Sequence, residues 1–302
     1  MKREVMGLIV KREDGSEIVN YDDPAFPSYI YEGWVFPKVT WERVPHYHED
    51  IEMIAVTEGT LGYSVNGKII TLKAGDTIFI NSNQIHYLMA MTEEIARYII
   101  FVFHPGIIST SPAVEMRSVV PVTGNEELPY IRFHKINENA ADIMKLMKSL
   151  PDIRRDPFLI TKTLYSIWEI ILKQSNAYGF MEKDDSSDSK KKLLKTMMHF
   201  VHSGYREAIN LEDIASSANI SKSFCNRIFK EYLQETPVNY VMHFRARKVA
   251  EYLRSGDLSL DEIAKLTGFN GTSYMSEIFK RFFDTSPLKY RKQWRLAERN
   301  LE

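Results

Sequence analysis

The feature that most constrains this chain of 302 residues is an internal repeat in its last third. NLEDIA at 210–215 returns as SLDEIA at 259–264, and FCNRIFKEYLQETPVNY at 224–240 returns as YMSEIFKRFFDTSPLKY at 274–290. Each copy has apolar residues at three- and four-residue spacing on both sides of a short turn. The repeat therefore predicts two similar units, each made of a short helix, a turn and a longer helix.

Helix boundary signals support this division. Gly268 suits the left-handed residue that follows a helix, and the prolines of Thr236-Pro237 and Ser286-Pro287 suit the first position of a new helix. One long helix from Pro237 to about Arg254 is expected to join the two units. Capping boxes are expected at the start of both short helices, formed by Asn210 with Asp213 and by Ser259 with Glu262.

Paired helix–turn–helix units suggest DNA binding, because such a unit places its second helix in the major groove. On the second helices Phe224 and Tyr274 are expected to face inward, whereas the outward residues are polar. Arg227 suits guanine, Asn226 suits adenine and Glu277 suits cytosine. The alternative is a plain helical hairpin with solvated faces. The candidate DNA-binding residues are Ser223, Asn226, Arg227 and Lys230 in the first unit, and Thr272, Ser273, Ser276, Glu277, Lys280 and Arg281 in the second.

The distribution of charge fits a polyanionic partner for the last third only. Residues 190–302 contain 20 Lys and Arg against 13 Asp and Glu, whereas the remainder is acidic and the whole chain has a net charge of −1. The single cysteine, Cys225, excludes an internal disulfide, and the apolar run near the N-terminus is too short to span a membrane. We expect a cytoplasmic protein with no membrane partner.

The first part of the chain predicts strands followed by helices. Residues 28–104 contain short β-rich runs, with Asn66-Gly67 as a hairpin turn and Gly75-Asp76 as another, which is typical of a sandwich or barrel. Apolar spacing changes to a helical period from about 137, and 181–190 is polar without period. The helices of 137–178 are expected either to pack on their own barrel or to join two subunits, with Leu164 and Trp168 as interface candidates.

The stretch VPHYHEDIE, residues 44–52, contains potential ligand residues that allow two interpretations. His46 and His48 with Glu52 suit either a metal ion or a pocket for a polar small molecule. As a metal centre they would suggest an enzyme, and as a pocket wall they would suggest a sensor.

From Arg247 to Tyr290 the chain resembles the AraC/XylS family of transcription regulators. The matching residues are R-K-V-A-x-x-L, S-L-D-E-I-A-x-x-x-G-F and S-Y-M-S-x-x-F-K-x-x-F-x-x-S-P-x-x-Y-R. The resemblance implies a DNA-binding domain of two helix–turn–helix units over the last 110 residues. Gln234 and Asp284 stand where the family commonly has glycine, so the first unit is expected to end differently. Glu277 stands where many members have arginine.

The N-terminal part resembles the cupin sensing domain found in many members of that family. His46-x-His48-x3-Glu52-x6-Gly59 matches the first cupin motif and Gly75-x10-His86 the second, although Thr40, Asn81, Asn83 and Ala90 depart from the motifs. The resemblance implies that His86 lies beside the other three residues. Three interpretations remain: a pocket for a small polar effector, a divalent transition metal site, or structural polar residues. Aromatic stacking groups such as Trp41 and Tyr63 favour a sugar.

Together these observations predict a two-domain α+β protein with a cupin-like β-barrel, flanking helices and an all-α double helix–turn–helix domain. The expected function is a homodimeric regulator that binds promoter DNA and responds to a small polar effector, with no required cofactor. The alternative is a metal-dependent cupin oxygenase or isomerase with a helical appendage. The expected boundaries are 1–136 for effector binding, 137–180 for dimerisation or packing, 181–190 for a linker and 191–302 for DNA binding.

Overall fold

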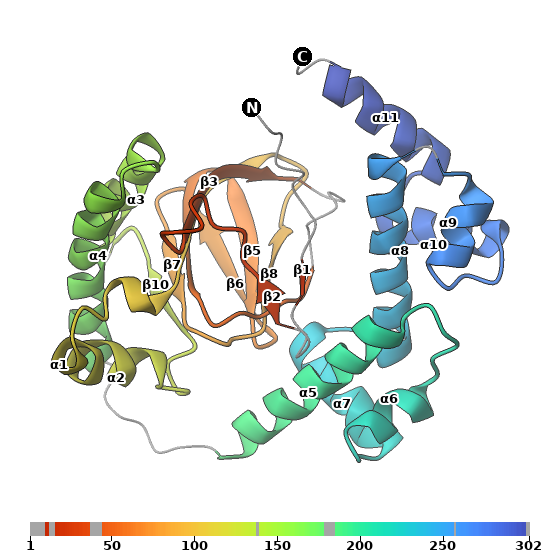
Figure 1. The fold of residues 1–302 in the computed structure, drawn as a ribbon, viewed down its shortest axis with the longest axis horizontal. Coiled ribbons are helices and arrows are strands. Elements are labelled where there is room, and N and C mark those ends of the chain that lie inside the picture. Colours follow the sequence, from red (N-terminus) through yellow and green to blue (C-terminus); the bar gives the residue numbers. More distant parts are fainter. Residues whose placement is uncertain are drawn as a thin grey trace. The chain divides into compact units, whose positions relative to one another are not determined.

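The computed structural model describes residues 10–11, 16–36, 44–136, 139–177, 185–256 and 258–299. The chain divides into two compact units (Figure 1), one made mainly of residues 9–189 and the other mainly of Lys190–Glu302. Within the described residues no helix has both the length and the apolar character needed to cross a membrane.

The N-terminal unit is built on two antiparallel sheets and a two-stranded hairpin. One sheet has the order β10-β7-β4-β9-β3, the other has the order β6-β5-β8, and β1 pairs with β2. The strands are β1 (Val10–Lys11), β2 (Glu17–Ile18), β3 (Ser28–Val35), β4 (Ile51–Glu58), β5 (Thr60–Val65), β6 (Lys68–Lys73), β7 (Thr77–Ile80), β8 (His86–Ala90), β9 (Ala96–Phe103) and β10 (Tyr130–Phe133).

The central strands of the five-stranded sheet, β7, β4 and β9, are buried on both faces, which explains their apolar runs. All residues from Ile51 to Val56 are buried, although successive side chains of a strand point to opposite faces. Met53 and Phe101 belong to the core that this sheet forms with the helices. On the other face Glu52 reaches Tyr63 of β5, so that this face lines the interior of the barrel.

Two helices, α3 (Ala140–Ile153) and α4 (Pro157–Ala177), cover the outer face of the five-stranded sheet (Figure 1). The expectation that Leu164 and Trp168 join two subunits is wrong, because both are buried in the chain's own core. Trp168 meets the ring of Phe79 edge-on at 6.2 Å and donates from Nε1 to the carbonyl of Ser118 at 3.0 Å. Four shorter helical segments precede α3 and α4 in the described chain: η1 (Pro105–Ile107), α1 (Pro112–Val114), η2 (Glu115–Val119) and α2 (Val120–Thr123).

The C-terminal unit is helical in the described residues and follows the predicted repeat. Its first helix begins at Asp185, so the prediction of an aperiodic linker over 181–190 is wrong from that residue onward. The polar residues of 181–190 show no apolar period, so their pattern predicts a loop although the helix has already begun at Asp185. The helices are α5 (Asp185–Gly204), α6 (Leu211–Ser217), α7 (Lys222–Leu233), α8 (Pro237–Ser255), α9 (Leu260–Leu266), α10 (Thr272–Phe283) and α11 (Pro287–Arg299).

Local turn chemistry determines most of these boundaries. Asn66 and Gly67 both have positive φ, as the predicted hairpin turn requires. Gly268 has φ +76°, and a Cβ there would approach the carbonyl oxygen of Tyr205 to 2.6 Å. Both predicted capping boxes are present, at the start of α6 and of α9.

The second helices of the two repeated units, α7 and α10, also end alike, contrary to the expectation for Gln234. Gln234 has φ 60° and Asp284 has φ 53°, so both close their helix in the left-handed conformation. The last residue of each helix, Leu233 in α7 and Phe283 in α10, is buried in both units. Residue type at this position therefore changes the strain of the turn and not its shape.

Candidate functional site

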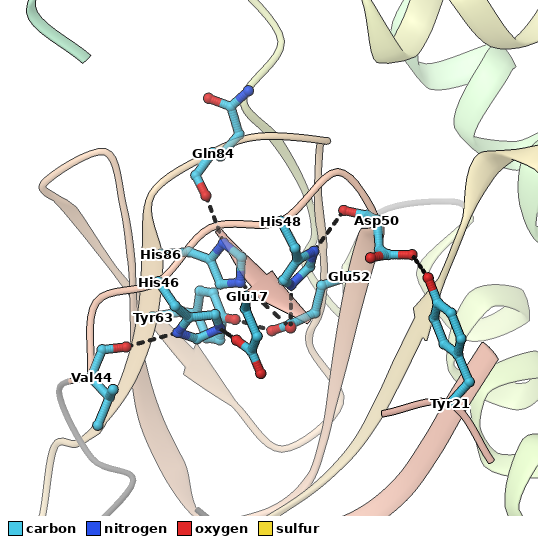
Figure 2. A network of polar contacts seen from close by, with 10 residues as sticks. All are labelled: Glu17, Tyr21, Val44, His46, His48, Asp50, Glu52, Tyr63, Gln84 and His86. Atoms are coloured by element: carbon cyan, nitrogen blue, oxygen red, sulfur yellow. Dashed lines mark hydrogen bonds and ion pairs between the residues drawn. The ribbon is translucent and has the colours of Figure 1, made fainter. Parts of the chain in front are cut away.

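The site in the barrel is a cluster of three histidines and one glutamate, His46, His48, Glu52 and His86, which we call the His–Glu cluster (Figure 2). His46 and His48 lie just before β4, Glu52 is the second residue of β4, and His86 begins β8. A backbone bridge between His46 and His86 joins the two segments. The barrel thus brings together residues that are 40 positions apart in the sequence.

Each histidine of the cluster is oriented by a backbone carbonyl two residues away. His46 Nδ1 lies 2.8 Å from the carbonyl oxygen of Val44, and His86 Nδ1 lies 2.8 Å from that of Gln84. His48 Nδ1 lies 3.0 Å from that of Asp50 (Figure 2). A carbonyl oxygen only accepts, so each Nδ1 carries the hydrogen and each Nε2 is left with a lone pair when the ring is neutral.

The three Nε2 atoms then face carboxylate oxygens, which are acceptors too. Glu52 Oε2 lies 3.6 Å from His48 Nε2 and 3.5 Å from His86 Nε2. The Nε2 atom of His86 is buried and makes no hydrogen bond within the described residues. A cage of converging acceptors is stable only if a proton or a cation supplies positive charge.

The protonation of Glu52 and His48 follows from this arrangement. Burial raises the pKa of Glu52, but His86 and His48 outweigh it and hold that pKa well below its usual value. Burial lowers the pKa of His48, but the hydrogen bond and charge of Glu52 outweigh it and the net pKa is raised. The carboxylate is therefore ionised, and His48 holds a proton more readily than an ordinary histidine.

The pKa values of His46 and Tyr63 are shifted in opposite directions. Burial and the nearby His86 hold the pKa of His46 well below its usual value, which keeps its ring neutral. Tyr63 donates from its hydroxyl to Glu52 Oε1, and its ring stacks on that of His86 at 6.0 Å between centroids. Burial and the charge of Glu52 raise the pKa of Tyr63 well above its usual value. Tyr63 therefore acts as a permanent hydrogen-bond donor to the cluster.

The donor set fits a divalent transition metal. All four ligand atoms lie within 4.8 Å of one another. Metal–ligand distances of about 2.0–2.2 Å place neighbouring ligands of a tetrahedral ion about 3.4 Å apart, close to the contacts around Glu52. Carbonyl groups that fix the outer ring nitrogen are the usual support of histidine ligands. The observation that most directly favours a cation here is the Nε2 atom of His86, which is buried, makes no hydrogen bond within the described residues and lies 3.5 Å from Glu52 Oε2.

The four ligand atoms of the cluster lie within 4.8 Å of one another, too close together for a sugar ring to lie between them. The side chains of His46 and Glu17 are 18% and 21% exposed, against 1–4% for His48, Glu52 and His86. Glu17, from β2, was missed by sequence reasoning because it lies outside both motifs. The predicted stacking residue Trp41 lies outside the described residues.

The second site is the pair of recognition helices, α7 and α10. The ring of Phe224 is half-buried beneath the guanidinium of Arg227, which lies 4.8 Å from its centroid. Tyr274, expected inward, is instead 48% exposed and leans on Phe269. The candidate DNA-binding residues divide into exposed ones, Ser223, Arg227, Lys230, Ser273, Glu277, Lys280 and Arg281, and half-buried ones, Asn226, Thr272 and Ser276.

A buried arginine that sequence reasoning did not select connects segments of both helix–turn–helix units within the C-terminal part of the chain. Arg245 of α8 donates from Nε to the carbonyl oxygen of Tyr205 at 2.7 Å and from Nη2 to that of Glu207 at 2.6 Å. Its guanidinium also lies 5.9 Å from the ring centroid of Phe269, in the turn of the second unit. Its helical spacing resembled that of a surface cation, and no local signal marked it as buried.

Comparison with known proteins supports both predicted regions, the cupin-like region and the helix–turn–helix region. A family model described as a helix-turn-helix domain matches residues 214–293, and one described as a cupin domain matches residues 34–103. The HTH-type transcriptional regulator YdeC of Bacillus subtilis is 30% identical over 253 residues, which are 82% of this chain and 85% of YdeC. The chain belongs to the AraC/XylS family of transcription regulators.

Two further similarities are weaker. The HTH-type transcriptional activator RhaS of Salmonella dublin is 24% identical over 268 residues, which are 87% of this regulator and 92% of RhaS. A crystal structure of ToxT from Vibrio cholerae has a TM-score of 0.45 at 14% identity and covers 88% of this chain and 97% of ToxT, too low a score to carry an argument.

Membership of the family confirms the predicted class, an α+β regulator with a cupin-like region and a double helix–turn–helix region that binds DNA. The relatives are transcription regulators, so the alternative of a metal-dependent oxygenase or isomerase is abandoned.

Proposed function

We propose that this regulator binds promoter DNA through α7 and α10 and responds to a small polar molecule bound at the His–Glu cluster, with a sugar or sugar derivative as the first candidate. The observation that carries the proposal is the convergence of three histidine Nε2 atoms and a buried carboxylate within 4.8 Å. Such a group of acceptors is costly to bury unless something positive or hydrogen-donating occupies it.

A divalent transition metal in the cluster is part of this proposal. His46, His48, Glu52 and His86 would hold it, and it would supply a Lewis-acidic position for an oxygen atom of the effector. The effector itself would then lie against His46, the most exposed of the four residues, because the ligand atoms lie too close together to enclose it.

The regulator is further proposed to act as a homodimer. The buried faces of α3 and α4 are committed to the barrel, so a partner would have to meet their outer face. There Phe158 is 76% and Leu159 36% exposed, and apolar residues on a helix surface favour association. Light scattering of the purified chain tests this directly, and a monomer at micromolar concentration would contradict it.

The test of effector binding compares wild-type protein with His48→Ala. Purified protein is analysed for bound metal, and its melting temperature is then measured with Zn²⁺, Mn²⁺, neutral sugars and sugar acids. A ligand that binds only the native state raises the melting temperature with its concentration. We expect at least one probe to stabilise wild type and not His48→Ala. Equal behaviour of both proteins towards every probe would mean that the cluster is a structural feature.

A further inference from the structure

The two helix–turn–helix units of the C-terminal part are joined by more than their connecting helix. The helix α8 runs from the end of α7 to just before α9, so its length sets the distance between the two units. A connecting helix by itself leaves the tilt of each unit free to change, because the few residues at its ends can act as hinges. The angle between α7 and α10 therefore depends on contacts beside α8.

One such contact is made by the turn between α9 and α10, which packs on the loop between α5 and α6. A Cβ on Gly268 would lie 2.6 Å from the carbonyl oxygen of Tyr205 and 2.7 Å from that of Arg206. Backbone meets backbone here, and glycine allows this close approach because it has no side chain. The ring of Tyr205 also meets the ring of Phe244 of α8 at 5.3 Å between centroids. The loop that leads into the first unit thus contacts both α8 and the turn of the second unit.

Arg245 of α8 lies where these three elements meet. Its side chain is only 6% exposed, and it donates from Nε to the carbonyl oxygen of Tyr205 and from Nη2 to that of Glu207. Its guanidinium faces Phe269, whose ring belongs to the core of the second unit. A planar guanidinium donates several hydrogen bonds in fixed directions, so it holds a loop backbone more rigidly than an ammonium group does.

The burial of Arg245 distinguishes it from the cations that are placed to contact DNA. Its donors are directed at backbone carbonyl oxygens inside the domain, whereas phosphate contacts need a cation at the surface. Lys230 and Lys280 are exposed on α7 and α10 and meet that condition. Replacement of Arg245 therefore removes no phosphate contact directly, and any effect on DNA binding acts through the position of the second unit.

We propose that Arg245 is a positioning residue for DNA recognition, which holds the α9–α10 turn against the loop before α6 and so directs α10 into the major groove next to the one that α7 enters. The idea rests on the proposed function, since it assumes that both helices face DNA. Two modules held at the correct span bind more tightly than two loosely joined ones, because the second contact then needs little further ordering. Without Arg245 the contact of α10 should weaken, while that of α7 should persist.

Hydroxyl-radical footprinting of the full chain measures the two contacts separately. The DNA is selected by the wild-type protein from a library of random duplexes. The proteins are wild type, Arg245→Met, Arg245→Lys and Arg247→Met. The last is a matched control, because Arg247 is another buried arginine of α8 and its guanidinium lies 5.6 Å from the ring centroid of Phe244 in the same helix. Lys280→Ala identifies the protected patch that belongs to α10.

We expect wild type to protect two patches about one helical turn of DNA, or about 34 Å, apart. Arg245→Met should lose more than about half of the protection at the α10 patch, keep the α7 patch and bind about tenfold more weakly. Arg245→Lys should show a smaller change in the same direction, and it carries the comparison if Arg245→Met fails to fold. A protein that is merely destabilised would lose both patches in proportion, because an unfolded molecule makes neither contact.

Two results would overturn the idea in distinguishable ways. If the Arg245 variants keep the wild-type ratio of the two patches, or if Arg247→Met changes that ratio equally, Arg245 has no positioning role of its own, while DNA binding by the two helices stands. If wild type selects no sequence from the library and protects no DNA, the proposed function fails and the inference fails with it.

Discussion

At the scale of single residues, the two recognition helices differ at one equivalent position, Arg227 in α7 and Glu277 in α10, both exposed. A guanidinium can bond guanine in two places and also attracts phosphate, whereas a carboxylate repels the DNA backbone. The first unit is therefore expected to contribute most of the specific binding energy. The second unit contributes mainly position and contacts from residues such as Lys280.

Arg227→Ala should weaken specific DNA binding by about 1–3 kcal/mol if the side chain contacts a base. Lys230→Ala is the matched control on the same helix, since loss of a phosphate contact weakens binding to all sequences and lowers the salt dependence. Fluorescence anisotropy with a specific and a scrambled duplex separates the two effects. An Arg227→Ala protein with the wild-type binding curve would refute the assigned role.

Asp76 supports the barrel in a pH-dependent way. Its buried carboxylate accepts from Arg132 Nη2 at 2.8 Å and from the backbone of Lys73 and Lys135. Burial raises the pKa of Asp76, but Arg132 and the backbone hydrogen bonds outweigh it, so the net pKa falls below 3.8. A carboxyl group whose pKa is lower in the folded than in the unfolded chain stabilises the fold at any pH above its unfolded pKa. This stabilisation is lost as the pH falls through its folded pKa.

Asp76→Asn should therefore lower the free energy of unfolding of the barrel by about 1.5–3 kcal/mol at pH 7. The difference from wild type should shrink as the pH falls below about 4, because the wild-type carboxyl group then takes up a proton. Urea unfolding at several pH values, followed by Trp fluorescence, measures this. A difference that stays constant down to pH 3 would count against the ion pair as its cause.

At the scale of helices and strands, much was predictable because the determinants are local. The Asn66-Gly67 turn, both capping boxes and Gly268 act within a few residues, and the structure has each of them. Exposure of Tyr274 was not predictable, because its ring rests on Phe269 at the edge of the core and does not enter it. Glu17 reaches the cluster through a strand pairing that no spacing encodes.

The end of α7 is a strained element. Gln234 adopts the left-handed conformation, which glycine tolerates without cost. Gln234→Gly should therefore raise the free energy of unfolding of the C-terminal unit by about 0.5–1 kcal/mol after the higher entropy of the unfolded chain is subtracted. Asp284→Gly should raise the free energy of unfolding by less, because Asp adopts the left-handed conformation more readily than Gln does. Thermal melts would contradict this if Gln234→Ala stabilised the protein as much as Gln234→Gly.

The helix α4 is expected to stabilise the barrel through its buried face. Leu164→Ala should lower the free energy of unfolding by about 2–5 kcal/mol, since Leu164 is fully buried against the sheet. Ser166→Ala, on the same helix but exposed, should change it by less than about 0.5 kcal/mol. Urea unfolding compares the two, and equal losses would show that the helix is held in some other way.

At the scale of the whole molecule, sequence reasoning reached the class of protein because two independent patterns pointed to it. The tandem repeat predicts DNA binding, and the spacing of His46, His48, Glu52 and His86 indicates a sensing barrel. The nature of the effector was out of reach, because it depends on which atoms face solvent. In the structure His46 and Glu17 are the partly exposed residues at this site.

The central claim is that DNA binding by α7 and α10 is controlled from the His–Glu cluster. A ligand changes DNA affinity only by favouring one arrangement of the chain over another, so loss of the cluster should remove the response and leave DNA binding. The most direct measurement is a gel-shift titration of wild type and His48→Ala on DNA upstream of the gene, with and without the sugars and sugar acids.

We expect both proteins to bind the same DNA specifically, and an effector to shift the binding midpoint of wild type several-fold while that of His48→Ala stays in place. Absence of specific binding by wild type under every condition, or a His48→Ala protein that responds as wild type does, would contradict the account.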